Sequence, residues 1–471
     1  MSLPIISVPQ MRDWEKATWT SGQTEAEVIR RVGKKVAEVA LRLTCADDFV
    51  LLLAGRGHNG DDVRAAREHF LQRRVELLEV ASPETDIPKL EAALVRKPAL
   101  IVDGLFGIGL DRPLDAAWIR FVSRVNESHR PVLAVDVPSG LNADTGEPWG
   151  AAIEATVTLT VGVPKQGMVQ HTAWPHVGRL EVATDVGLIP CPFSESELRW
   201  IMPEDFEGFP AARAASGHKG TFGHLAIIAG SLGFHGAAVL AARGAQRSQP
   251  GLISLHTHEQ TYHIIASQMQ AVMVKVWEAT QKLPEHFSAY LIGPGLSAPD
   301  LPNDMKLFTR RMWRDSLLPV VVDAGALEWI QQENLTKVGI RVITPHPGEA
   351  ARLRRTTPQL IQANRPLAVR EISRQHGHCW VVLKGHQTLI GRSTGEIFVN
   401  GSGNPLLGQG GSGDVLAGYI AGLLAQPHSQ LDAAKTLCYA VWQHGAAADA
   451  LSALRKNWII EELAAEIGSV A

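Results

Sequence analysis

Short apolar runs rich in Val, Ile and Leu recur along this 471-residue chain, and each run is closed by a glycine-rich or polar turn. Continuous apolar runs are typical of strands that are buried on both faces of a parallel sheet. Amphipathic stretches, of which Val63–Arg74 is one example, lie between several of the runs and are expected to be helical. Strand–helix alternation of this kind predicts a doubly wound α/β architecture.

The runs form two series, separated near residues 190–215 by a segment that is poor in apolar periodicity. In the first series we expect strands at Val50–Ala54, Ala99–Asp103, Val132–Val137, Thr156–Val161 and Leu180–Ala183. In the second series we expect strands at His224–Ala229, Leu252–His256, Ala289–Ile292, Val320–Asp323, Val342–Thr344 and Trp380–Leu383. Because one hydrophobic core seldom serves so long a chain, we predict two doubly wound α/β domains, residues 1–205 and 206–471.

Charge and cysteine content exclude several classes of protein. The net charge of -3 gives no electrostatic reason to expect nucleic acid or an anionic membrane as a partner. The four cysteines form no CxxC pair, which argues for a reducing compartment and against a disulfide framework or a zinc site. No export signal is visible, and no stretch reaches the roughly 18 apolar residues that span a bilayer. We therefore expect a cytoplasmic protein that binds small molecules.

The sharpest chemical signal is the glycine-rich turn Gly408–Asp414, which is followed directly by the helical run Val415–Leu424. Such a turn presents free backbone N–H groups and the positive end of a helix dipole to an anion, here through Gly411, Ser412 and Gly413. The carboxylate of Asp414 could accept a proton from a hydroxyl while the turn stabilises a moving phosphoryl group. Taken alone, the motif also fits a tight turn with a capping aspartate.

Three other strand ends carry polar or glycine-rich clusters instead of apolar caps. They are Gly293–Gly295, Thr344–Glu349 and Lys384–Thr388, and the last of these brings a cation and a hydroxyl. In open α/β sheets, ligands bind outside the carboxyl ends of the strands. The clusters together therefore predict a phosphate or nucleotide site in the second half of the chain.

These motifs occur in one order along residues 210–471: HKGTFGH (218–224), AGS (229–231), GAA (236–238), IGPGL (292–296), VVDAGAL (321–327), TPHPGE (344–349), LKGHQT (383–388), GQGGSGDVLAG (408–418) and HGAAAD (444–449). In this order the second half resembles the ribokinase-like ADP- or ATP-dependent NAD(P)H-hydrate dehydratases. The resemblance implies a ribokinase-like fold, with ADP or ATP and Mg²⁺ as cofactors. It implies phosphorylation of the C6 hydroxyl of the hydrate, loss of phosphate and return of NAD(P)H.

The same resemblance implies particular site residues. Nucleotide contacts are implied for Gly413 and for Lys384, Gly385, His386, Gln387 and Thr388. Contacts to the hydrated cofactor are implied for Ala238, Gly295, His346 and Asp414, with Asp414 as the base. The alternative for this half is a small-molecule kinase on the same scaffold, because a fold does not fix a function.

In the first half, the first expected strand ends in Gly55–Asp62, whose residues 55–60 meet the G-x-G-x-x-G pattern and predict a Rossmann-like domain. In dinucleotide-binding domains an acidic residue at the end of the next strand binds the ribose 2′-OH, and here only Glu79 is a possible candidate. Ordinary NAD-dependent dehydrogenase activity is therefore disfavoured. Asp103 and Asp136 each end an apolar run and are expected at the same edge of the sheet. With Asn59 and Ser139 they could ligate a hard cation or accept a proton, although strand-end aspartates also cap turns.

The first half resembles the NAD(P)H-hydrate epimerases through Gln10-Met11-Arg12, GRGHNGDD (55–62), DGLFGIGLDRP (103–113), AVDVPSGLNADTG (134–146) and VGVPKQGM (161–168). The resemblance implies a potassium ion held by Asn59, Asp103 and Ser139. It implies Asp136 as the acid/base group at C6. Substrate contacts are implied for His58, Asn59, Gly60, Asp61 and Asp62, and for Gly107, Ile108, Gly109, Leu110, Asp111, Arg112 and Pro113.

Two features depart from the epimerase pattern. The usual N-N-G-G-D-G loop is here His58-Asn59-Gly60-Asp61-Asp62-Val63, and the segment around residues 20–38 lacks the usual methionine-glutamate-rich helix. A charge at Asp61, where a pyrophosphate would approach, leaves open that this half is a binding or scaffold module. Otherwise the chain is expected to be bifunctional, to epimerise R and S hydrates before dehydrating the S form, and to form a homo-oligomer.

Overall fold

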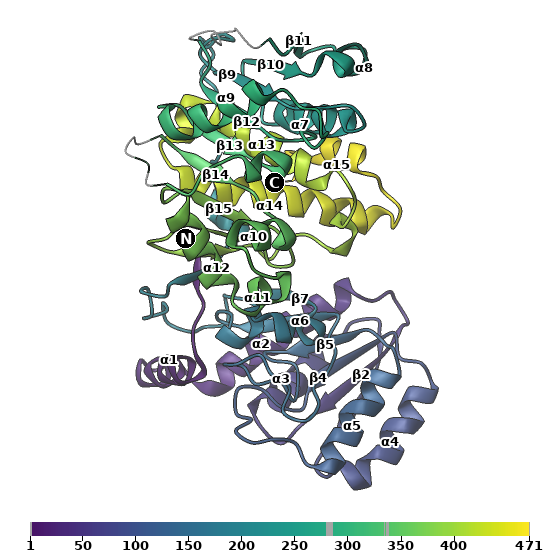
Figure 1. Cartoon of the computed structure of the whole chain (residues 1–471). Coiled ribbons are helices and arrows are strands. Elements are labelled where there is room, and N and C mark those ends of the chain that lie inside the picture. Colours follow the sequence, from purple (N-terminus) through teal and green to yellow (C-terminus); the bar gives the residue numbers. More distant parts are fainter. Residues whose placement is uncertain (1, 279–285, 334, 336–338, 471) are drawn as a thin grey trace. The chain divides into compact units, whose positions relative to one another are not determined.

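The computed structural model describes residues 2–278, 286–333, 335 and 339–470 (Figure 1). The chain divides into two compact units, of which one is Leu3–Glu197 and the other contains Leu198–Ala471. In each unit, helices alternate with the strands of a sheet that is wholly or mainly parallel. This architecture confirms the predicted α/β fold class.

The sheet of the N-terminal unit is parallel throughout, in the order β3-β2-β4-β5-β6-β7. Its strands are β2 (Phe49–Ala54), β3 (Arg74–Glu79), β4 (Leu100–Gly104), β5 (Val132–Val135), β6 (Val157–Val161) and β7 (Arg179–Ala183). Its helices are α1 (Val8–Thr20), α2 (Glu25–Arg42), α3 (His58–Ala66), α4 (Pro83–Val95), α5 (Ala116–Glu127) and α6 (Trp174–Val177); the two-residue strand β1 is Leu3–Pro4.

Two hydrophobic cores cover the two faces of this sheet. Apolar side chains of α2 and α3 pack on one face, and those of α4 and α5 pack on the other. Along β2 the faces alternate, so that Leu52 belongs to the first core while Leu51 and Leu53 belong to the second. The strand order reverses at β2, which pairs with both β3 and β4. In an open α/β sheet, such a reversal leaves a crevice at the carboxyl ends of the strands.

The sheet of the C-terminal unit has the order β8-β17-β16-β15-β14-β13-β12-β9-β10-β11. Its parallel central strands are β9 (His224–Ile228), β10 (Leu252–Thr257), β12 (Ala289–Ile292), β13 (Val320–Val322), β14 (Arg341–Ile343) and β15 (Trp380–Leu383). Its outer strands are β8 (Leu198–Trp200), β11 (Met273–Val276), β16 (Leu389–Gly391) and β17 (Ile397–Val399), with β16 antiparallel to both of its neighbours. Six parallel strands, β15-β14-β13-β12-β9-β10, therefore end at one edge.

The helices of this unit are α7 (His235–Arg247), α8 (Tyr262–Ala266), α9 (Asn303–Asp315), α10 (Pro347–Arg354), α11 (Pro358–Ala363), α12 (Arg365–Gln375), α13 (Ser412–Leu424), α14 (Ala433–Leu454) and α15 (Ile460–Glu466). Helices α7, α13, α14 and α15 share the main hydrophobic core with the sheet. Helices α7 and α13 touch backbone to backbone: a Cβ at Gly418 would lie 1.9 Å from the carbonyl oxygen of Ala241, and one at Gly244 2.1 Å from that of Val415. Glycine is required at both positions.

The predicted strands are found with small changes at their ends. β12 and β15 have the predicted bounds, whereas β5 ends two residues early because Asp136 adopts a left-handed backbone conformation, φ +60°. The predicted helix over Val63–Arg74 is found only in part: Val63–Ala66 belong to α3, and Arg67–His69 form a 3-10 turn. Helix α3 begins inside the glycine loop, capped by Gly57, and ends at Ala66, and Arg74 already belongs to β3. Among the described residues, no helix is long and apolar enough to cross a membrane.

Candidate active sites

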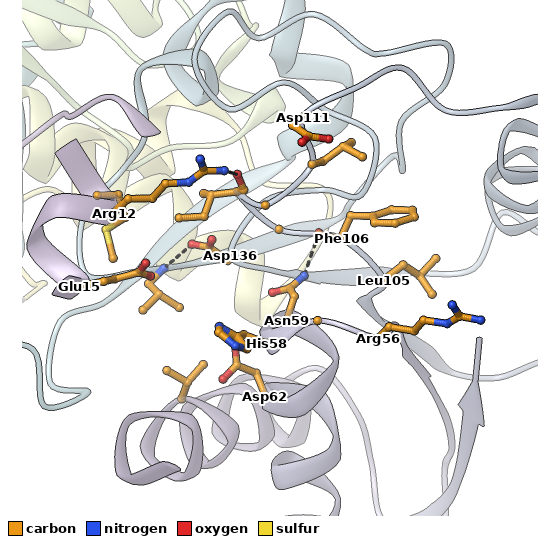
Figure 2. Close-up of a pocket in the computed structure, with 18 of the residues that line it drawn as sticks. Arg12, Glu15, Arg56, His58, Asn59, Asp62, Leu105, Phe106, Asp111 and Asp136 are labelled. Atoms are coloured by element: carbon orange, nitrogen blue, oxygen red, sulfur yellow. Dashed lines mark hydrogen bonds between the residues drawn. The ribbon is translucent and has the colours of Figure 1, made fainter. Parts of the chain in front are cut away.

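A cavity of about 1020 Å³ opens at the carboxyl ends of the N-terminal strands (Figure 2). Its wall includes the loops after β2, β4 and β5 together with residues of α1, α2, α3 and α5. The predicted residues His58, Asn59, Asp62, Gly107–Pro113 and Asp136 all line it. The cavity thus occupies the crevice that the reversal of strand order creates.

Asp136 and Lys165 form a buried ion pair beside this cavity. The Lys165 ammonium is fully buried and donates to Asp136 Oδ1 at 2.5 Å, to Thr160 Oγ1 at 2.9 Å and to the Val161 carbonyl at 2.9 Å. The backbone N–H of Val161 donates to the same Asp136 oxygen at 3.1 Å. Three acceptors use all three ammonium hydrogens, so Lys165 is a fixed counter-ion for Asp136.

Two further carboxyl groups, Glu15 of α1 and Asp62 of α3, line the cavity near Asp136. Burial raises the pKa of Glu15, and the Asp136 charge raises it further. Burial also raises the pKa of Asp62 well above its usual value, again with Asp136 as the next cause. Carboxyl groups that share a poorly solvated site cannot all ionise cheaply, so burial and the Asp136 charge both favour the protonated forms of Glu15 and Asp62.

Asn59, Asp103 and Ser139 lie together beneath the loop after β4. Ser139 donates from Oγ to Asp103 Oδ1 at 2.6 Å and from its backbone N–H to Oδ2 at 2.9 Å. Asn59 Nδ2 donates to the Phe106 carbonyl at 2.8 Å, while the buried Asn59 Oδ1 has no partner among the described residues. Burial raises the pKa of Asp103 to about 6 despite these hydrogen bonds. An orphaned oxygen beside a buried carboxyl group is the donor set that suits a hard cation.

Gly60 and Asp61 do not line the cavity. Asp61 Oδ1 accepts a hydrogen bond from Arg64 at 2.7 Å, and Arg64 also pairs with Glu79 at the end of β3. A Cβ at Gly60 would lie 2.1 Å from the Gly55 carbonyl oxygen, so glycine is required here because the two ends of the loop pack closely together. His58 does line the cavity and pairs with Glu25 at 2.6 Å.

In the C-terminal unit, a half-buried lysine lies among carboxylates. Lys384, directly after β15, has its ammonium 3.0 Å from Asp323 Oδ1 and 3.9 Å from Glu349 Oε2. Burial by itself lowers the pKa of Lys384, but the charges of Asp323 and Glu349 outweigh burial and raise it. Asp323, which follows β13, also accepts a hydrogen bond from Thr344 at 2.7 Å. Lys384 is therefore charged at neutral pH.

The glycine-rich turn lies over this lysine. Gly411 has φ +97° and caps α13, and a Cβ at Gly413 would lie 3.0 Å from the Lys384 ammonium nitrogen. Burial raises the pKa of Asp414 to about 7, Asp323 and Glu349 raise it too, and Lys384 lowers it. Behind the turn, buried His444 contacts the Ser412 carbonyl through Nε2 at 3.0 Å. Cation, amides and a proton-accepting carboxyl group thus meet at one point.

The loop Lys384–Thr388 is held from behind by Arg365, the first residue of α12. Its guanidinium donates to the carbonyls of His386 at 2.6 Å, Gln387 at 3.0 Å and Leu383 at 3.1 Å. Gly385 has φ +134° and Gln387 has φ +51°, so the loop needs this bracing to keep an unusual backbone path. Arg365 fixes the position from which Lys384 reaches the glycine-rich turn.

The remaining predicted residues follow other strands at the same edge. Gly295, with φ +68°, accepts a hydrogen bond at its carbonyl from Ser231 at 2.6 Å, which ties the loops after β12 and β9 together. His346 follows β14 and caps α10, with Nδ1 accepting from Gly348 N–H at 3.0 Å. Ala238 is fully buried near the start of α7, close to Gly230. The strand ends therefore gather these loops, while the Ala238 side chain faces protein.

Comparisons with known proteins divide the chain in the same way. The family model described as NAD(P)H-hydrate dehydratase matches residues 225–469, and the model described as YjeF-related protein N-terminus matches residues 61–167. A bifunctional NAD(P)H-hydrate repair enzyme of Gloeobacter violaceus is 33% identical over 95% of this chain and 94% of its own length. The chain belongs to the bifunctional NAD(P)H-hydrate repair enzymes. The Escherichia coli enzyme of this family is 30% identical over 92% of this chain and 86% of its own.

Solved structures support the ribokinase-like fold of the C-terminal unit of this repair enzyme. An ADP/ATP-dependent NAD(P)H-hydrate dehydratase of Bacillus subtilis, co-crystallised with ATP and Mg²⁺, has a TM-score of 0.50 and 31% identity; the match covers 55% of this chain and 92% of that one. A ribokinase-like superfamily protein of Enterococcus faecalis has a TM-score of 0.51 and 25% identity, over 58% and 95% of the two chains.

Five residues of the two sites were not identified from the sequence of this repair enzyme. Asp323 ends a strand as Asp103 and Asp136 do, so the rule applied to those two would have found it. Glu349 and Lys165 lie in recognised motifs, but only the fold places them beside Lys384 and Asp136. Glu15 and Arg365 carry no local signal, because each reaches its site from a helix distant in sequence.

Proposed function

We propose that the C-terminal unit dehydrates the S form of hydrated NADH or NADPH at the expense of ADP or ATP. The observation that carries this proposal is the meeting of Lys384, the amides around Ser412 and the carboxyl group of Asp414. A site for phosphoryl transfer needs a cation and N–H donors for the moving charge, and a base for the attacking hydroxyl. With a pKa raised to about 7, Asp414 is available as that base at neutral pH.

In this mechanism Asp414 takes the proton of the C6 hydroxyl as its oxygen attacks the terminal phosphorus of the nucleotide. Lys384 and the turn Gly411–Gly413 stabilise the charge on the transferring phosphoryl oxygens. The C6–O bond then breaks, phosphate leaves with the bonding pair, and loss of the proton at C5 restores the ring double bond. Mg²⁺ carried by the nucleotide would neutralise phosphate charge, and the oxygens of Glu349 and Asp414 are hard ligands that suit it.

We propose that the N-terminal unit interconverts the R and S hydrates, with Asp136 as an acid/base group at C6. Its support is the cavity at the strand ends, where Asp136 offers an oxygen held beside Lys165. A potassium ion fits Asn59, Asp103 and Ser139, because Asn59 Oδ1 is buried without a partner among the described residues. Such an ion would supply positive charge for a phosphate or hydroxyl of the bound hydrate.

The experiment uses the full chain and a mixture of R- and S-NADHX. With ADP or ATP we expect both epimers to be consumed and the NADH absorbance to return in full, whereas without nucleotide no NADH forms. Asp414→Asn should abolish the return of absorbance, because an amide cannot accept the hydroxyl proton. A plateau at the S fraction would make the N-terminal unit a scaffold, and accumulation of a stable phosphorylated product would make the C-terminal unit a kinase.

We further propose that the protein acts in the cytoplasm on small molecules. The four cysteines Cys45, Cys191, Cys379 and Cys438 are all free thiols, which suits a reducing compartment. Hydrated nicotinamide cofactors arise from the free coenzyme pool, so an enzyme that repairs them belongs with that pool. Fractionation of cells that express the chain, followed by assay of nucleotide-dependent NADH recovery in each fraction, tests this placement.

A further inference from the structure

Three carboxyl groups and one ammonium converge at one end of the N-terminal cavity. Asp136 faces the cavity from the end of β5, Asp62 from α3 and Glu15 from α1, and Lys165 is paired with Asp136. Figure 2 shows the side chains of Glu15 and Asp136 pointing toward one another. One ammonium can neutralise one carboxylate, so the other two groups are left without a buried cation of their own.

The hydrogen bonds of Asp136 are all on one oxygen. Lys165, Val161 N–H and Thr160 Oγ1 donate to Oδ1, at 2.5, 3.1 and 3.3 Å. Among the described residues, no group donates to Oδ2. These three donors hold Oδ1 in place. Asp136 therefore presents a carboxylate whose second oxygen is available to a ligand.

Glu15 is in the opposite situation. Helix α1 buries Met11, Trp14 and Thr18, and Trp14 is anchored by its indole N–H to the Ile189 carbonyl at 2.9 Å. This anchoring turns the half-buried Glu15 to the cavity, where no described group donates a hydrogen bond to it. The titratable groups that face Glu15 are Asp136, Lys165, His58, Asp62 and Glu25, of which the first raises its pKa most after burial itself.

Two carboxyl groups in one cavity, one fixed beside an ammonium and the other without a hydrogen-bond donor among the described residues, are an arrangement suited to paired acid and base catalysis. We propose that Glu15 is the general acid that works opposite Asp136, donating its proton to the C6 hydroxyl of the hydrated cofactor. This inference rests on the proposed epimerase function and extends it. In this scheme Glu15 protonates the hydroxyl that leaves as water, and Asp136 takes the proton of the water that adds.

Atoms and charge are conserved in each part of this reaction. Glu15 gives its proton to the C6 hydroxyl oxygen, the C6–O bond breaks with its electron pair on oxygen, and water leaves. The lone pair of the ring nitrogen forms the N1=C6 bond, so nothing is oxidised or reduced. Water then adds to the other face of C6, its electron pair returns N1 to its neutral form, and its proton passes to Asp136. Transfer of that proton from Asp136 to Glu15 restores the enzyme.

The test follows interconversion of purified R-NADHX to the S form by chromatography, with the full chain and without nucleotide. Glu15→Gln keeps shape and hydrogen bonding but has no proton to give. We expect its kcat for interconversion to fall by about 100-fold or more, with KM changed by less than about threefold. The pH profile adds a second readout: the wild-type rate should decline as pH rises through the Glu15 pKa, and this limb should vanish in Glu15→Gln.

The matched control is Asp13→Asn, an exposed carboxylate on the same helix, which should keep the wild-type rate. Nucleotide-dependent dehydration of S-NADHX by each variant reports whether the C-terminal unit is intact, and urea unfolding reports whether the N-terminal unit is folded. If Glu15→Gln interconverts the epimers at the wild-type rate while Asp136→Asn does not, Glu15 is not the acid and the epimerase proposal survives. If Asp62→Asn, and not Glu15→Gln, removes the decline in rate at high pH, then Glu15 is again not the acid and the epimerase proposal again survives. If the wild-type chain itself fails to interconvert the epimers, both proposals fall.

Discussion

Each unit places a lysine beside a carboxylate at the carboxyl ends of parallel strands, but the two lysines differ in how many partners they have. The Lys165 ammonium meets three acceptors within 2.9 Å and is fully buried. The Lys384 ammonium has one partner at 3.0 Å and one at 3.9 Å and lies under Gly413, and the Lys384 side chain remains 18% exposed. The first lysine has no hydrogen left to donate, whereas the second has.

This difference separates two uses of the same side chain. A saturated lysine holds a carboxylate in place and has no hydrogen free for a ligand. An unsaturated lysine among several carboxylates keeps its own charge and can turn to an arriving phosphate. We therefore propose that the ligand of the N-terminal unit meets carboxyl groups and not Lys165, whereas in the C-terminal unit it meets both Lys384 and Asp414.

The largest expected effect comes from removing the unsaturated lysine. Lys384→Met should lower kcat/KM for dehydration by about 1000-fold, because the phosphoryl charge loses its cation and the pKa of Asp414 rises above about 7. Steady-state kinetics with S-NADHX and ATP measure this. Interconversion of the epimers should be unchanged in the same variant, and a loss there would mean that the two units do not act separately.

Removing the saturated lysine should have a smaller catalytic effect and a clear structural one. Lys165→Met leaves Asp136 in a poorly solvated place without its counter-ion, which should destabilise the N-terminal unit by about 3 kcal/mol and slow interconversion by about 100-fold. Urea unfolding and chromatography of the epimers measure the two effects. Dehydration at the wild-type rate is the expected control result. A loss of dehydration equal to that in Lys384→Met would contradict the distinction between the lysines.

The bracing of the Lys384 loop can be tested through Arg365. Arg365→Met leaves three loop carbonyls without their donor, which should raise the Kd for ATP by about 30-fold, or about 2 kcal/mol. Calorimetric titration with ATP measures the change. The exposed Arg374 lies on the same helix, and Arg374→Met should bind ATP as the wild type does. Equal affinities of the two variants would remove the positioning role from Arg365.

The potassium proposal predicts how the stability of the N-terminal unit depends on pH. The folded pKa of Asp103 is raised to about 6, so its ionisation costs stability as pH rises through that value. Without potassium, unfolding of the wild type relative to Asp103→Asn should be about 1 kcal/mol more favourable at pH 7 than at pH 5. Potassium should abolish this difference, because a bound cation favours the carboxylate. A pH dependence identical in potassium and in tetramethylammonium would contradict the cation site.

The smallest effect is expected at the glycine loop itself. Asp61 pairs with Arg64 away from the cavity, so Asp61→Gly should change the interconversion rate by less than about threefold and stability by about 1 kcal/mol. Kinetics with R-NADHX decide the point. A large gain in rate would show that the charge at Asp61 does impede the bound cofactor, as the altered loop suggests.

The sequence predicted the central strands well and the peripheral ones poorly, for a physical reason. Buried strands such as β12 and β15 are short, continuous apolar runs bounded by turn residues, a pattern typical of the interior of a parallel sheet. β3 alternates charged and apolar residues at an edge of its sheet, and β16 and β17 are three residues long, so none of them gives a comparable signal. The start of α3 was missed because its first turn is the glycine loop, which carries no apolar periodicity.

Within the sites, the sequence predicted the residues that follow strands and missed those that arrive from helices. Asp414, Lys384 and Asp136 follow glycine-rich turns or apolar runs, and the fold brings each to a strand end. Arg365 and Glu15 reach the sites through tertiary packing alone, and no spacing in the sequence encodes that. The sequence also does not show which groups surround Lys384, because three separate loops bring them together at one edge of the sheet. The number of its hydrogen-bond partners is therefore known only from the fold.

The glycine contacts between α7 and α13 bear on how accurately Asp414 is aimed. No side chain separates the two helices at Gly244 and Gly418, so there is no flexible layer that could let one slide along the other. Gly418 lies one helical turn beyond Asp414, and even a single methyl group there would wedge the helices apart and swing the carboxylate off its target. Tolerance to mutation in this enzyme should therefore be lowest at a position that never meets the substrate.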